Sequence, residues 1–164
     1  MTARSPSRPL YVCVEGPIGV GKTTLVSQLS KRLAARTILE VVEENPFLAS
    51  FYEDRERYAF QTQIFFLMSR FQQQGVFAQG DLFTPSTVSD YHILKDRIFA
   101  RLTLRDAELA LYDKVYEGLE AQIVQPDVLI YLHAPIPVLL ERIARRGRPF
   151  EADFDQDYLI ALAQ

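Results

Sequence analysis

The sequence predicts an α/β fold of three layers, in which helices cover both faces of a central parallel sheet. Two observations predict it. A glycine-rich turn lies between an apolar run with strand character and a segment with helical periodicity. Beyond that turn, short apolar runs alternate with helical segments through the rest of the 164 residues. This alternation is typical of parallel strands joined by helices, with the active residues at the carboxyl ends of the strands.

The first element is the turn itself, residues 16–24, which reads Gly-Pro-Ile-Gly-Val-Gly-Lys-Thr-Thr. It follows the apolar run 9–15 and precedes leucines at 25, 29 and 33, so strand, glycine turn and helix occur in the order that a phosphate-binding loop requires. Glycines let backbone N–H groups turn towards phosphate oxygens, and the helix points its positive end at the same place. The alternative is a plain strand–turn–helix with a lysine at the helix start. We expect the nucleotide to bind Gly16, Gly19, Gly21, Lys22, Thr23 and Thr24.

Lys22 and Thr23 supply the chemistry of such a loop. The lysine reaches the β- and γ-phosphates, and the hydroxyl beside it binds Mg²⁺. We therefore expect ATP as the phosphate donor, Mg²⁺ as the metal, and Lys22 as a catalytic residue.

The remaining elements follow in order. A second strand at 37–42 is broken by the Glu-Glu-Asn-Pro stretch after it. Residues 49–74 carry four apolar side chains on one helical stripe, and a loop with two glycines and a proline follows at 75–85. Residues 128–133 are apolar almost without interruption, as in a parallel strand covered on both faces. The other elements are a strand at 86–91 and helices at 93–104, 106–124 and 137–146, which brings the strands to four.

Polar side chains gather where the predicted strands end. Glu40 lies near the end of the second strand and Asp90 at the end of the third. Gln63 and Arg70 are two helical turns apart, so they share a helix face. The alternative for each is an ordinary solvated position.

Four arginines, Arg142, Arg145, Arg146 and Arg148, crowd the end of the last helix. A run of arginines is more often a solvated face than a binding site. Beside a phosphate loop, however, guanidinium groups suit bidentate phosphate binding. We favour a clamp on the transferred phosphate.

Composition excludes several classes of protein. The net charge of −3 gives no general attraction to nucleic acid, and no apolar run approaches the roughly 18 residues of a membrane helix. The single cysteine, Cys13, cannot form an internal disulfide, so a reducing cytoplasm is the expected compartment. Residues 1–8 are expected to be a flexible tail before a single domain at 9–164.

Taken in order, these segments resemble the deoxynucleoside kinase family, especially its bacterial deoxyadenosine/deoxyguanosine kinase-like branch, from the phosphate loop to about Glu151. The stretch Glu-Val-Val-Glu-Glu-Asn-Pro at 40–46 is similar to the family's Glu-Pro-Val segment, which implies that Glu40 is the general base for the nucleoside 5′-hydroxyl. The resemblance implies catalytic lid arginines at Arg142, Arg146 and Arg148, and a metal site at Thr23 and Asp90. It implies substrate contacts from Tyr52, Gln63, Arg70, Asp96 and Glu151.

The sequence departs from the family pattern in three places. Val41 replaces a proline, and Tyr91 replaces the arginine of a Glu/Asp-Arg-Ser triplet, which here reads Asp-Tyr-His. The third departure is that the chain stops at Gln164, before the fifth strand that the family fold adds, so the domain is expected to be truncated there. If the chain is active, we expect another arginine to supply the charge that Tyr91 lacks. Arg97 is one candidate, and we expect a lid arginine, Arg142 or Arg146, to carry the larger share.

The resemblance implies an ATP-dependent deoxynucleoside kinase of nucleotide salvage, which acts as a homodimer or as a heterodimer with a related kinase subunit. Asp96 accepts an amino hydrogen that thymine lacks, so deoxyadenosine or deoxyguanosine is the expected substrate, with deoxycytidine possible and thymidine poor. In the alternative, Arg70 and Asp96 form a structural ion pair and bind no base. Two other functions stay open, a nucleoside monophosphate kinase and a nucleotide-binding regulatory subunit of a heteromeric kinase.

Overall fold

The computed structural model describes residues 8–42, 44–78, 86–148, 157 and 160–161. Within them, four parallel strands form one sheet in the order β2-β3-β1-β4. The first strand lies in the interior of the sheet, where Val12 is paired with Val88 on one side and with Val128 on the other. The strands are β1 (Tyr11–Glu15), β2 (Arg36–Ile38), β3 (Thr87–Ser89) and β4 (Val128–Tyr131).

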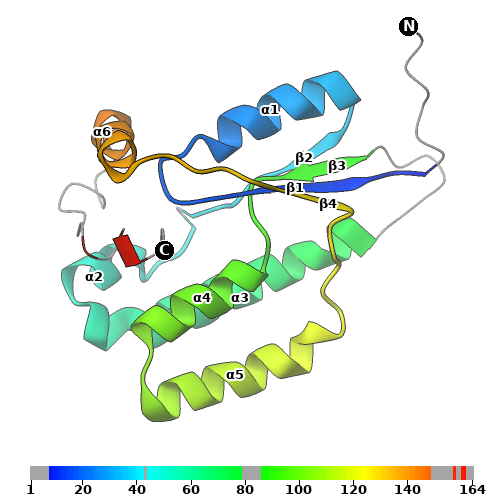
Figure 1. Ribbon diagram of the computed structural model, residues 1–164. Helices are drawn as coiled ribbons and strands as arrows, with labels where there is room; N and C mark the ends of the chain where they lie inside the picture. The colour runs from blue at the N-terminus through cyan, green and yellow to red at the C-terminus, as the bar shows by residue number, and fades with distance from the viewer. Residues whose placement is uncertain (1–7, 43, 79–85, 149–156, 158–159, 162–164) are drawn as a thin grey trace, which may run out of the picture.

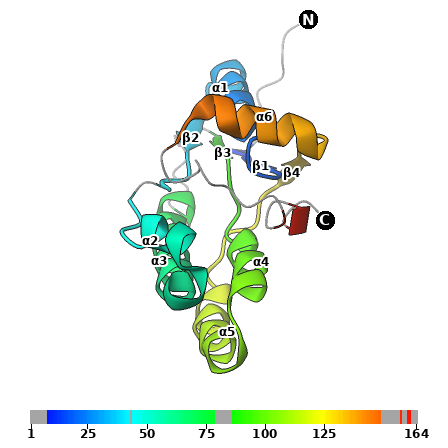
Figure 2. The same ribbon diagram turned by 90° about the vertical axis from the view of Figure 1, so that its left-hand side faces the viewer.

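Helices cover both faces of this sheet, which confirms the predicted three layers (Figures 1 and 2). Helices α1 (Lys22–Leu33) and α6 (Ile136–Arg146) lie on one face. The other face carries α2 (Leu48–Glu53), α3 (Arg55–Ala78), α4 (Leu94–Thr103) and α5 (Asp106–Glu120). In this part of the chain, no helix is long and apolar enough to cross a membrane.

Two apolar clusters hold the layers together. The larger one joins α3, α4 and α5 through fully buried side chains such as Leu67, Ile93 and Tyr112. A smaller one packs Val26 of α1 on Val14 and Val88 of the sheet. The larger cluster fixes these helices to one another, and the smaller one fixes α1 against the strands, so the loops at the carboxyl ends of the strands start from a rigid base.

Most predicted elements differ from the structure by a few residues at their ends, and two of these differences have a clear cause. The segment 49–74 is divided at Asp54, whose carboxylate accepts a hydrogen bond from the Arg57 N–H at 3.2 Å and so caps a new helix. The second strand ends at Ile38 rather than at residue 42, because the Glu40 N–H donates to the Asp90 side chain and not to a neighbouring strand.

The expectation that residues 128–133 are covered on both faces is wrong within the described chain. β4 lies at the edge of the sheet, and Val128, Leu129 and Tyr131 are between 44% and 60% exposed. An edge strand can be as apolar in sequence as a central one, so composition alone did not separate the two.

The close approach of the phosphate loop to the chain after β4 generates a prediction at Gly16. Its φ is +146°, and a Cβ there would lie 2.4 Å from the Leu132 carbonyl oxygen. We expect Gly16→Ala to lower the free energy of unfolding by about 2 kcal/mol or more. Gly118→Ala, on the exposed side of α5 with open space around it, is the control and should gain up to about 1 kcal/mol from helix propensity. Urea unfolding measures both, and equal stability of the two variants would contradict the packing argument.

Candidate active site

The phosphate loop runs from the end of β1 into α1 and has the backbone that its glycines permit. Gly19 and Gly21 have positive φ values of 82° and 106°. The Lys22 ammonium donates to the carbonyl oxygens of Gly16 at 2.7 Å and Pro17 at 3.2 Å. Burial lowers the pKa of this ammonium to about 8, and the Lys95 ammonium adds to the shift. Lys22 is therefore held along the loop whose phosphates it is expected to bind.

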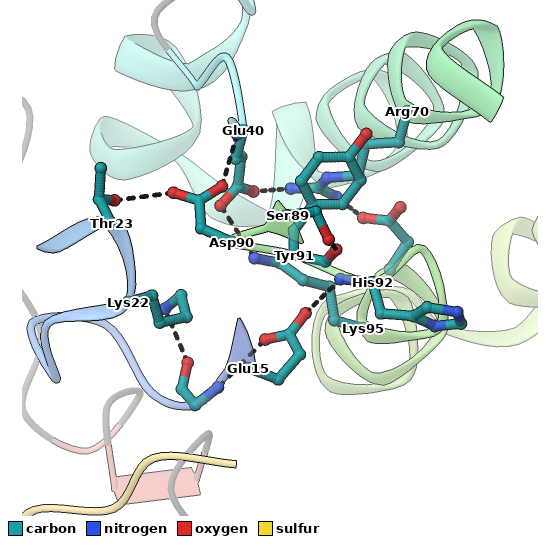
Figure 3. A network of polar contacts seen from close by, with 12 residues as sticks. Glu15, Lys22, Thr23, Glu40, Arg70, Ser89, Asp90, Tyr91, His92 and Lys95 are labelled. Carbon is teal, nitrogen blue, oxygen red and sulfur yellow. Dashed lines mark hydrogen bonds and ion pairs between the residues drawn. The ribbon is translucent and has the colours of Figure 1, made fainter. Parts of the chain in front are cut away.

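Asp90 connects the loop to the chain after β2 (Figure 3). One of its carboxylate oxygens accepts the Thr23 hydroxyl at 2.7 Å, and the other accepts the Glu40 N–H at 2.7 Å. Thr23 and Asp90, the two residues predicted for the metal, are thus adjacent and offer only oxygen ligands. Such a pair fits Mg²⁺, which prefers a few carboxylate or hydroxyl oxygens together with substrate phosphates.

The Glu40 carboxylate lies between two cations. Arg70 from α3 pairs with one oxygen, and the Lys95 ammonium from α4 lies 2.9 Å from the other. The three side chains are only 7–15% exposed. Burial alone would raise the pKa of the Glu40 carboxyl, but Lys95 and Arg70 outweigh it and hold that pKa well below its usual range. Glu40 is therefore ionised throughout the pH range in which proteins work.

Arg70 also pairs with Asp96, which is fully buried. The guanidinium lies over the ring of Phe66 at 4.7 Å and near that of Tyr91 at 5.7 Å. The ion pair that sequence analysis left open as an alternative is therefore present. A role of this pair in binding a base stays a prediction.

Tyr91, at the position of the family arginine, is a buried packing residue. Its side chain is fully buried, its hydroxyl donates to the Gln73 amide oxygen, and its carbonyl accepts the Ser89 hydroxyl at 2.9 Å. These bonds fix the turn between β3 and α4 from which Asp90 and Lys95 extend.

One cavity of about 780 Å³ extends from the phosphate loop to α3, a size typical of small-molecule sites. It collects most of the predicted residues, namely Gly19, Gly21, Lys22, Thr23, Thr24, Glu40, Tyr52, Gln63, Arg70, Asp90, Arg142, Arg146 and Arg148. Gly16 lies beneath the loop and Asp96 behind Arg70, so neither lines the cavity. Glu151 is outside the described residues.

The arginines at the end of α6 face the phosphate loop. Arg142 donates to the Val20 carbonyl oxygen at 2.9 Å, and Arg145, Arg146 and Arg148 line the same cavity. Their position across the loop is compatible with a clamp on phosphate oxygens.

Sequence analysis missed Lys95 and assigned the charge to a lid arginine or to Arg97. Arg97 pairs with Asp113 at 3.1 Å and lies over the Tyr116 ring, and it does not line the cavity. The signal that could have pointed to Lys95 is its place in the first turn of the helix that follows the third strand.

Comparisons with known proteins agree on one family. The family model described as deoxynucleoside kinase matches residues 12–164. The deoxyguanosine kinase of Bacillus subtilis (strain 168) is 41% identical over 152 residues, which cover 91% of this chain and 72% of that protein. The deoxyadenosine/deoxycytidine kinase of the same organism is 40% identical over 156 residues, covering 90% and 70%. A solved structure of deoxyadenosine kinase from M. mycoides, with dCMP and a flexible dCDP bound, matches with a TM-score of 0.83 and 26% identity, covering 94% of this chain and 80% of that one.

Proposed function

The chain belongs to the deoxynucleoside kinase family, and we propose that it transfers the γ-phosphoryl group of ATP to the 5′-hydroxyl of a purine deoxyribonucleoside. The observation that carries the proposal is the single cavity in which the phosphate loop and the ionised Glu40 face each other. A donor phosphate at Lys22 and an acceptor hydroxyl at Glu40 both lie within it. This is the arrangement that in-line phosphoryl transfer needs.

In the proposed reaction, Glu40 orients the 5′-hydroxyl and takes its proton. The 5′-oxygen forms a bond to the γ-phosphorus, while the bond from that phosphorus to the bridging oxygen breaks and leaves ADP. Lys22 and the lid arginines Arg142, Arg146 and Arg148 neutralise the negative charge on the transferred group.

Thr23 and Asp90 would hold Mg²⁺, and their adjacent oxygens support this assignment. When bound, the metal would offset the negative charge of the donor phosphates. The side chains of the chain itself still have to orient the acceptor, and that task falls to Glu40 and the residues around it.

The preferred base is proposed from Gln63 and Arg70, which line the nucleoside end of the cavity. Gln63 both donates and accepts, whereas Arg70 only donates and Asp96 beside it only accepts. Asp96 is fully buried behind Arg70, so an amino group of a purine or of cytosine would have to reach it past the Arg70 guanidinium, and thymine has no such group. The relatives whose names include deoxyguanosine, deoxyadenosine and deoxycytidine support the same preference.

The substrate proposal predicts a ranking of the four deoxynucleosides. Deoxyadenosine and deoxyguanosine should be the best acceptors, and kcat/KM for thymidine should be at least about 10²-fold lower, because a site that hydrogen-bonds an amino group of the base rejects a base that lacks one. ADP release with ATP and Mg²⁺ measures all four, with the nucleoside monophosphates included to test the alternative acceptor class. Lys22→Ala is the control for background and should have no turnover. Thymidine as the best substrate would sink the base-binding role of Arg70 and Asp96.

The assignment of the base predicts different behaviour for the two carboxylates. Glu40→Gln keeps the shape of the side chain and should lower kcat by about 10²–10⁴-fold, with ATP affinity retained. Asp90→Asn should instead weaken the dependence of the rate on Mg²⁺, because its oxygens lie at the Thr23 hydroxyl. Steady-state kinetics at several Mg²⁺ concentrations separate the two effects. Full activity in Glu40→Gln with none in Asp90→Asn would assign the base to Asp90.

The quaternary state is proposed to be a dimer built on α4. Leu94, Ile98 and Leu102 are spaced four residues apart and exposed, and they form one apolar face of the helix. We expect light scattering to give twice the mass of one chain, and Ile98→Asp to reduce it towards a single chain. Arg32→Asp on α1, which lies on the opposite face of the sheet, is the charge control. If the unmodified protein has the mass of a single chain, the homodimer is refuted, and the heterodimer with a related kinase subunit remains as the proposal.

A further inference from the structure

We propose that Lys95 is the positioning residue of this reaction, the cation that fixes Glu40 in the orientation from which it meets the acceptor hydroxyl. The inference rests on the proposed function and concerns a residue for which sequence analysis gave no role. It also accounts for the absence of an arginine at position 91.

The contact that supports it is direct. The Lys95 ammonium lies 2.9 Å from one Glu40 oxygen, and the Lys95 side chain is 13% exposed and lines the cavity. The ammonium lies 5.9 Å from the centre of the Phe99 ring, one helical turn further along α4. A lysine held in this way has its charge at the junction between the phosphate loop and the acceptor site, and three N–H donors to place there.

Arg70 cannot do this work alone. Its guanidinium pairs with both Glu40 and the fully buried Asp96, so one of its two terminal nitrogens bonds a residue outside the cavity. It reaches only one of the two Glu40 oxygens. Without Lys95 the second oxygen loses its partner, and the carboxylate is held from one side only.

The fold explains why the cation comes from position 95. Tyr91 precedes α4 and has its hydroxyl bonded to Gln73, so its side chain packs inside the molecule. Lys95 lies in the first turn of α4, and that turn brings its side chain back to the strand ends. The positive charge that Tyr91 does not provide before α4 is thus provided by Lys95 within α4.

The lining of the cavity also places Lys95 at its reacting end. Lys95 and Lys22 both line it, on the two sides of the junction between the phosphate loop and Glu40. Lys22 belongs to the donor side and Lys95 to the acceptor side. Two cations in these places favour an anionic group that passes between them.

The test compares three variants of the full chain with deoxyadenosine and deoxyguanosine as acceptors. Lys95→Met removes the charge and keeps much of the side chain, Lys95→Arg restores a charge, and Lys114→Met makes the same change on the exposed face of α5. We expect Lys95→Met to lower kcat about 10²-fold or more, since a misplaced reacting group has an effect of that size, with KM for ATP changed less than about threefold. Lys95→Arg should recover at least a tenth of wild-type kcat, and Lys114→Met all of it.

The split between kcat and KM supplies a readout that a purely structural role would not move. If Lys95 orients Glu40, Lys95→Met lowers kcat while KM for ATP and the free energy of unfolding stay near their wild-type values, and Lys95→Arg recovers part of kcat. If Lys95→Met fails to fold, as judged by its unfolding transition, Lys95→Gln takes its place.

The outcomes distinguish a failure of the proposed kinase function from a failure of the role proposed for Lys95. No turnover of any deoxynucleoside by the wild-type chain refutes the proposed function itself. An active wild type with wild-type kcat in Lys95→Met overturns the role of Lys95 alone. Equal losses of kcat in Lys95→Met and Lys95→Arg, with a lowered free energy of unfolding in both, also overturn it and leave Lys95 as a structural partner of Glu40.

Discussion

The arrangement of the site depends on one buried carboxylate, Glu40, and the two cations that keep it ionised. Burial opposes its charge, so without Arg70 and Lys95 the group would be neutral or turned to solvent. The two partners come from α3 and α4, and the backbone of Glu40 is bonded to Asp90 after β3. One ionised group thus holds together two helices and a strand end. Buried ion pairs of this kind add little net stability, but losing one partner is costly, because it strands a charge in the interior.

A strongly paired carboxylate is a weak base, and this bears on how Glu40 acts. General bases work best with a pKa near the operating pH, whereas that of Glu40 lies far below it. Phosphoryl transfer passes through a loose transition state in which little proton transfer is needed before the bond to the leaving group weakens. A base that is always ionised, and fixed by bonds to both oxygens, suits such a reaction. Its main contribution is then the direction in which it holds the hydroxyl.

The sequence predicted the local parts of this site and missed those that depend on packing. The phosphate loop, the four strands and the residues Glu40, Gln63 and Arg70 follow from spacing and from residue type. Lys95 and Asp96 are adjacent in sequence, but Lys95 lines the cavity and Asp96 is fully buried behind Arg70. Which of two consecutive polar residues on a helix faces a site depends on how that helix is rotated against α3. The same holds for β4, whose apolar composition does not reveal that it lies at the edge of the sheet.

Asp90 links the donor and acceptor halves of the cavity, because its two oxygens bond different partners. The Thr23 hydroxyl belongs to the phosphate loop, and the Glu40 N–H belongs to the acceptor site. A shift of the β3 end would therefore move both halves together and preserve their spacing. The bonds of Glu15 strengthen this connection, since its carboxylate accepts the N–H groups of Gly16 in the loop and His92 after β3. The distance between the donor phosphate and the acceptor hydroxyl is thus fixed at the carboxyl end of β3. Tyr91 stabilises that strand end by packing, and Lys95 provides the positive charge beside Glu40.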